Sequence, residues 1–129
     1  MNLVKIETWQ ERDETGNFEA ISWDLFPIVI STETHHLQDN GVPKIGVKIK
    51  SGMIIVGKIA KTSQFDPNKG PNSLEIHGWP FEKLKATYGK MWKDTSIYST
   101  EESEGTVVTA SVEKIGDRLR ATVEIDIDS

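Results

Sequence analysis

The sequence predicts a mainly β protein: a small antiparallel barrel or sandwich of about seven to eight strands built from hairpins, with one short helix near residues 80–90. Three observations carry this prediction. Apolar and polar residues alternate over 106–127, turn-forming residues separate several other extended stretches, and apolar residues recur at helical spacing near 80–90. Because 129 residues is a common size for one domain, we expect a single β-rich domain over residues 1–129.

Residues 106–127 predict a hairpin that turns at Gly116-Asp117. With the turn placed there, one face of the two strands is apolar and the other is polar, as a half-buried hairpin requires. The register pairs Val112 with Ala121, Ala110 with Val123 and Val108 with Ile125 on the apolar face, and Glu113 with Arg120 and Ser111 with Thr122 on the polar face.

A second hairpin is expected to join residues 45–50 to residues 53–60 through a turn at Ser51-Gly52. The return strand begins with apolar residues on both faces, which is typical of a strand buried on two sides, so we expect it to be central. Gly57 inside this strand marks either a bulge or a close approach by another segment.

A third hairpin is expected near the N-terminus, between residues 3–12 and residues 18–23, around a polar loop at 13–17. Pro27 follows it and interrupts the pattern. Residues 28–34 then predict another strand that begins just after this proline, where a missing backbone N–H is tolerated.

One short helix is expected after Pro80, which suits a first helical turn. Phe81, Leu84 and Tyr88 recur at helical spacing, and Gly89 is a candidate terminator. This spacing predicts an apolar stripe that lies on the sheet.

Composition limits the classes of partner and compartment. The chain has 15 basic and 20 acidic residues, a net charge of −5, and no cysteine. Mild acidity repels phosphate groups, so we expect nucleic acid to be an unlikely partner. The absence of cysteine fits a reducing compartment, and no apolar run is long enough for a membrane helix. We therefore expect a cytoplasmic protein with no membrane partner.

No motif for catalysis or for a cofactor stands out. The sequence contains no Gly-x-Ser-x-Gly elbow, Gly-x-Gly-x-x-Gly fingerprint or P-loop, which favours a non-enzymatic protein and leaves an enzyme open, and we assign no catalytic residue and no cofactor. His35, His36, Asp39 and His77 are the candidate metal ligands. Adjacent histidines on a strand point to opposite faces, which favours a solvated pair over a shared metal.

The favoured hypothesis is a non-enzymatic cytoplasmic module that binds another protein, of the inhibitor or immunity type, with a basic partner suited to its acidic charge. Large aromatic side chains dominate protein interfaces, and a turn-rich loop precedes the helix. The expected contact residues are Phe65, Asp66, Asn68, Lys69, Asn72, Tyr88 and Trp92.

Three alternatives stay open. The first is a small β-barrel that binds a nucleic acid or a small ligand, because five lysines concentrate around residues 44–61. The second is a metal-assisted enzyme that uses His35, His36 and His77. The third is a structural subunit of a homo-oligomer or of a phage-like assembly, built by strand addition at sheet edges. The lysines of the first alternative are Lys44, Lys48, Lys50, Lys58 and Lys61.

Overall fold

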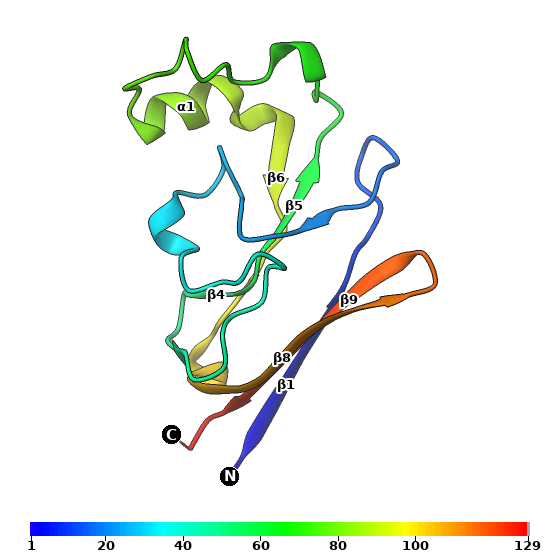
Figure 1. Ribbon diagram of the computed structural model, residues 1–129, viewed down its shortest axis with the longest axis vertical. Helices are drawn as coiled ribbons and strands as arrows, with labels where there is room; N and C mark the ends of the chain where they lie inside the picture. The colour runs from blue at the N-terminus through cyan, green and yellow to red at the C-terminus, as the bar shows by residue number, and fades with distance from the viewer. Residues whose placement is uncertain (129) are drawn as a thin grey trace.

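A computed structural model describes residues 1–128 and shows an elongated, mainly β molecule (Figure 1). A four-stranded antiparallel sheet lies at one end, close to both termini, and the helix lies at the other end (Figure 1). The large sheet curls into a half-barrel, so the predicted fold class is confirmed. Its strands, in spatial order, are β1 (Leu3–Trp9), β9 (Arg118–Asp126), β8 (Gly105–Ile115) and β3 (Lys48–Ile49).

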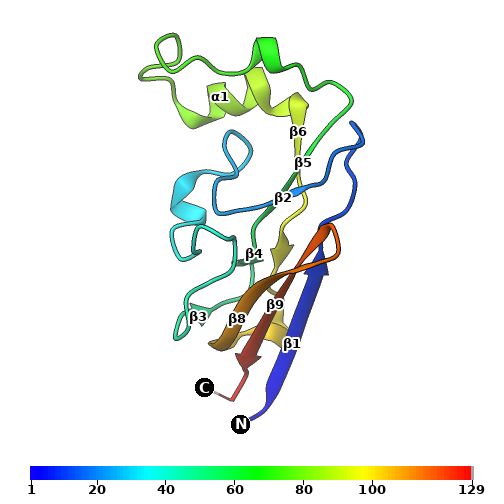
Figure 2. The same cartoon turned by 45° about the vertical axis from the view of Figure 1, so that its right-hand side comes forward.

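Two smaller antiparallel sheets connect this half-barrel to the helical end (Figure 2). One contains β2 (Ala20–Ile21), β5 (Lys58–Lys61) and β6 (Trp92–Asp94), and the other pairs β4 (Ile54–Val56) with β7 (Ile97–Tyr98). The helix α1 spans Phe81–Tyr88, and short 3-10 turns lie at Ser31–Glu33, Pro67–Lys69, Gly89–Met91 and Glu101–Ser103.

The β8–β9 hairpin has the predicted turn and most of the predicted register. Val112 pairs with Ala121, Ala110 with Val123, Glu113 with Arg120 and Ser111 with Thr122. The predicted pair of Val108 with Ile125 is wrong. A bulge between Val107 and Thr109 places Val107 opposite Ile125, and Val107 rather than Val108 is buried.

The main core lies between the concave face of the large sheet and the segment that contains β4. Ile54, Ile55 and Val56 are all at most 1% exposed, which confirms the expectation of a strand buried on both faces. Gly57, directly after them, meets Ser22 closely. An added Cβ would lie 2.1 Å from the Ser22 carbonyl oxygen, so the close approach expected here is confirmed.

The predicted hairpin over residues 45–60 is wrong beyond its turn. The Met53 N–H donates to the Lys50 carbonyl, as a turn at Ser51-Gly52 requires, but the two flanking strands separate. β3 pairs with β8, and β4 pairs with β7. The pairing of a buried strand depends on the packing of the whole core. Here the two partner strands, β7 and β8, both come from the C-terminal third of the chain.

The predicted N-terminal hairpin is present only near its loop. Arg12 and Phe18 form an isolated bridge, whereas β1 pairs with β9 and β2 pairs with β5. The predicted strand over 28–34 is also wrong. The N–H groups of Ile28 and Val29 donate to the Leu25 carbonyl, and a 3-10 turn follows, so this segment is coiled.

The helix α1 occurs where it was predicted, with Pro80 as its N-cap and Gly89 as its C-cap. We expected the helix to lie on the large sheet, and this expectation is wrong. The helix packs at the opposite end of the molecule (Figures 1 and 2), where Phe81 meets the segment around Phe26 and Ile30. The helix therefore builds a separate end of the domain and does not cover the half-barrel.

A buried ion pair joins the half-barrel to the second sheet. The Lys58 Nζ atom lies 2.9 Å from the Glu19 Oε1 atom, and both side chains are only 6% exposed. The same ammonium donates to the Thr8 hydroxyl and to the Trp9 carbonyl of β1. Glu19 Oε1 also accepts the Glu11 N–H. All three ammonium protons thus have acceptors, which compensates for their removal from water.

We predict that Lys58→Met lowers the free energy of unfolding by about 3–5 kcal/mol, because it leaves the Glu19 carboxylate buried without its cation. Urea denaturation followed by circular dichroism measures this change. Lys114→Met, on the exposed end of β8, is the matched control and is expected to stay within about 0.5 kcal/mol of the unaltered protein. A loss for Lys58→Met no larger than that of the control would contradict this role.

Candidate functional site

The helical end of the molecule is basic, although the whole chain is acidic. Residues 61–93 contain six lysines and three acidic residues, so this segment carries +3 while the whole chain carries −5. We call residues 61–93 the basic end. Five of its lysines are exposed, namely Lys69, Lys83, Lys85, Lys90 and Lys93. The segment with excess positive charge therefore forms the helical end of the molecule, opposite the half-barrel (Figure 1).

Aromatic rings lie between these lysines. Trp79 stacks on Tyr88 with 6.2 Å between ring centroids, and the Lys83 Nζ atom lies 4.0 Å from the Trp79 ring centroid. Phe65 meets Trp92 edge to face at 5.6 Å. Rings interleaved with cations provide both stacking surfaces and charge, which is the combination that nucleic-acid surfaces use.

One pocket of about 420 Å³ opens within the basic end. Phe65, Asp66, Lys69 and Tyr88, four of the predicted contact residues, line it together with Lys90 and Met91. Asp66 begins the 3-10 turn at Pro67–Lys69, and its Oδ1 atom accepts the Asn68 N–H. The local turn chemistry therefore orients this wall of the pocket.

The remaining predicted contact residues lie around this pocket. Trp92 contacts Phe65 from β6, and Asn68 is exposed on the 3-10 turn. Asn72 has a local role, because its side chain accepts the Leu74 N–H. The lysines of α1 were not predicted as contact residues from the sequence. The charge of each segment, counted separately, is the signal that reveals them.

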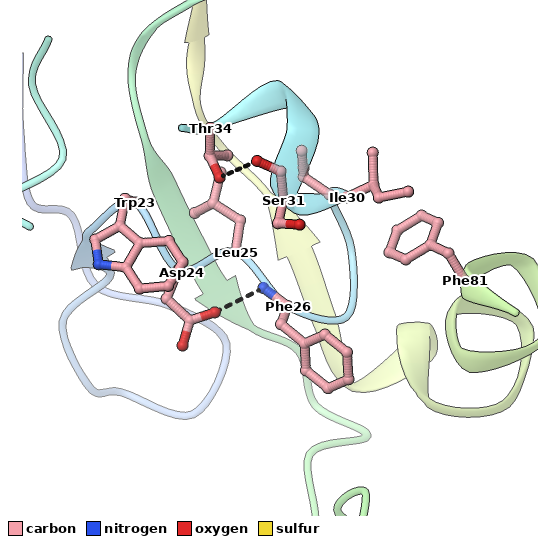
Figure 3. A pocket seen from close by; sticks show the side chains of 9 residues that line it. Trp23, Asp24, Leu25, Phe26, Ile30, Ser31, Thr34 and Phe81 are labelled. Atoms are coloured by element: carbon pink, nitrogen blue, oxygen red, sulfur yellow. Dashed lines mark hydrogen bonds between the residues drawn. The ribbon is translucent and has the colours of Figure 1, made fainter. Parts of the chain in front are cut away.

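A second, apolar pocket of about 160 Å³ lies between α1 and the coiled segment around residues 23–34 (Figure 3). The rings of Trp23, Phe26 and Phe81 line it. Its one carboxylate, on Asp24, accepts the Phe26 N–H (Figure 3). This lining offers apolar contact, and it contains no pair of acid and base that could carry out chemistry.

The histidine candidates do not form a metal site. No group of three or more His, Cys, Asp or Glu side chains that could hold a metal occurs within residues 1–128. The His36 Nε2 atom lies 2.7 Å from the Ile54 carbonyl oxygen, so this ring has a structural partner. His35, Asp39 and His77 are exposed.

The lysines predicted as one patch around residues 44–61 are separated. Lys58 is buried in its ion pair, so it offers no charge to a ligand. Lys44 lies in a different hollow from Lys48 and Lys50. Lys61, the last of them, begins the basic end, where its Nζ atom lies 4.5 Å from the Phe65 ring centroid.

Asp13 holds the N-terminal loop against the first residue of the basic end. Its Oδ2 atom accepts the Lys61 N–H, and its Oδ1 atom accepts bonds from Thr15 and Asn17. Burial alone would raise the pKa of this carboxyl, but the four hydrogen bonds outweigh burial and lower the pKa below its usual 3.8.

Residues 2–128 match the family model described as RNA polymerase Rpb2, domain 6. The chain belongs to this family. It is 33% identical over 116 residues to the DNA-directed RNA polymerase subunit beta of Syntrophus aciditrophicus, which covers 87% of this chain and 8% of that relative. The corresponding subunit of Porphyromonas gingivalis is 31% identical over 101 residues, 75% of this chain and 7% of the relative. The chain thus spans less than a tenth of the length of these relatives.

The family corrects the functional hypothesis. The prediction of an inhibitor-type or immunity-type module for a basic protein partner is wrong, because the chain is a polymerase-family domain. The prediction that nucleic acid is an unlikely partner is also wrong. Net charge misled that prediction, since the −5 of the whole chain is the sum of +3 on residues 61–93 and −8 on all other residues. No helix within residues 1–128 is long and apolar enough to cross a membrane.

We predict that Asp13→Asn destabilises the protein at about pH 7 and that the difference shrinks toward about pH 3. A lowered pKa in the folded state stabilises the fold above the unfolded-state pKa, and this contribution disappears as the pH falls through the folded-state pKa. Urea denaturation at both pH values measures the difference. Asp117→Asn, in the exposed β8–β9 turn, is the control. An equal difference at both pH values would contradict the assignment.

Proposed function

We propose that this chain works in DNA-directed RNA polymerase as a β-subunit-type domain, and that its basic end contacts the phosphates of nucleic acid. The match of residues 2–128 to the Rpb2 domain 6 family carries this proposal. Supporting evidence comes from the charge separation, which places +3 on residues 61–93 of an acidic chain. Lysines on such a surface replace counterions along the phosphate backbone, and this release drives binding.

In this proposal the half-barrel is the scaffold and the basic end is the contact surface. The half-barrel is rich in hydrogen-bonded strands and includes the long β8–β9 hairpin. Its four strands carry five basic and four acidic residues, so they add little net charge, and most of the acidic residues lie outside both these strands and residues 61–93. In this proposal the domain approaches nucleic acid with α1 leading. The predicted single domain and cytoplasmic location belong with this proposal, since bacterial transcription takes place in the cytoplasm.

We predict that replacing basic-end lysines weakens nucleic-acid binding and reduces its salt dependence. Fluorescence anisotropy with a labelled RNA–DNA hybrid, measured over a salt series, gives the slope of log K against log salt concentration. Each phosphate contact that is lost should reduce this slope by about 0.7–0.9. The test variant changes three lysines of the basic end to glutamine, namely Lys83, Lys85 and Lys93.

The matched control changes the same number of charges on the large sheet, with Lys5, Lys48 and Lys114 each replaced by glutamine. Both triple variants have the same net charge, so a difference between them reports position and not total charge. The proposal fails if the unaltered protein shows no salt-dependent binding, or if both triple variants lose affinity equally.

A further inference from the structure

The pocket within the basic end has features that phosphate contact does not require. Phe65, Tyr88 and Met91 give it an apolar lining, while Gln64 and Thr87 add polar groups. A volume of about 420 Å³ lies within the range of small-molecule sites, about 300–1,000 Å³. Phosphates along a smooth basic surface need no such hollow.

We propose that this pocket takes one unpaired nucleobase from a single-stranded stretch of RNA or DNA. The inference rests on the proposed function and names the form of nucleic acid that its basic end recognises. The sugar-phosphate chain on either side of the base runs over Lys69 and Lys90, which lie at the pocket and are exposed. The base enters between these two charges.

The aromatic lining supplies a stacking surface whose rings are already held in place. Trp79 stacks on Tyr88 at an interplanar angle of 22°, and Tyr88 lines the pocket. Phe65 meets Trp92 edge to face, and the Lys61 Nζ atom lies 4.5 Å from the Phe65 ring centroid. Fixed rings lose little side-chain freedom when a base stacks on them, and stacking accepts every base because each has a π face.

Polar groups at the pocket are available for the edge of a base. The Gln64 side-chain amide makes no hydrogen bond to residues 1–128, so it offers both a donor and an acceptor. The Thr87 hydroxyl donates to the Lys83 carbonyl and still has lone pairs that accept. In a duplex the base edges are paired and the bases are stacked on each other, so a pocket of this kind selects single strands.

Two adjacent positions on α1 separate pocket occupancy from general charge. Thr87 lines the pocket, whereas Ala86 is exposed on the same helix and does not line it. Thr87→Asp and Ala86→Asp add the same negative charge at neighbouring, exposed positions, so both variants should fold. We expect Thr87→Asp to bind a labelled oligo-uridine at least fivefold more weakly than Ala86→Asp does, and to bind a fully paired RNA–DNA hybrid equally well.

The ring variants test stacking directly. Tyr88→Leu should weaken binding of the oligo-uridine by about 5- to 150-fold, the range for one stacked base, while Tyr88→Phe keeps the ring and the affinity. Phe18→Leu, which alters an aromatic residue beside Arg12 and outside the pocket, should change nothing. Circular dichroism melts establish that each variant is folded.

The outcomes distinguish this inference from the proposed function. If the unaltered protein binds neither oligo-uridine nor hybrid, the proposed function itself is wrong. If it binds the hybrid through the basic-end lysines, but Thr87→Asp and Ala86→Asp bind oligo-uridine equally, the proposed function stands and the base pocket is wrong. Weakening of single-strand binding that is confined to Thr87→Asp and Tyr88→Leu supports the pocket.

Discussion

The buried pair of Lys58 and Glu19 is the interaction on which the arrangement of this domain depends. Lys58 begins β5, and its ammonium bonds the Trp9 carbonyl at the end of β1, so one side chain joins two sheets. β5 and β6 then lead directly from this joint to the basic end (Figure 2). A buried charge tolerates little displacement from its partners, because each lost contact leaves a charge without water. This ion pair therefore sets the direction in which the basic end projects from the half-barrel.

This geometry supports the proposal that an acidic chain of the polymerase family approaches nucleic acid through one end. The half-barrel strands are nearly neutral, with five basic and four acidic residues, and the basic end lies at the other end of the molecule (Figure 1). In the proposed function, the excess positive charge at one end of the molecule orients the domain during its approach. The close approach of Gly57 to Ser22 packs the same connection tightly. In the proposed function, scaffold and contact surface are thus separate parts of one short chain.

Sequence patterns predicted the local elements and missed their distant partners. Alternation over 106–127 predicted β8 and β9 because a two-residue turn sets the register of both strands. No periodic pattern indicates that β3 pairs with β8, since that choice depends on the whole core. The available signal for the buried ion pair was Lys58 itself, a charged residue directly before Ile59 in an otherwise apolar stretch. Ring size and loop composition led to the prediction of Phe65 and Tyr88 as contact residues, and the ligand class proposed for them comes from the family and the placement of charge.

Photo-crosslinking to nucleic acid tests the central claim most directly. The full chain would be irradiated with a 4-thiouridine-labelled RNA, digested, and analysed by mass spectrometry to locate the cross-linked residues. The account predicts cross-links within residues 61–93, concentrated at the aromatic rings of the basic end. Cross-links on the strands of the half-barrel, with none in the basic end, would contradict it.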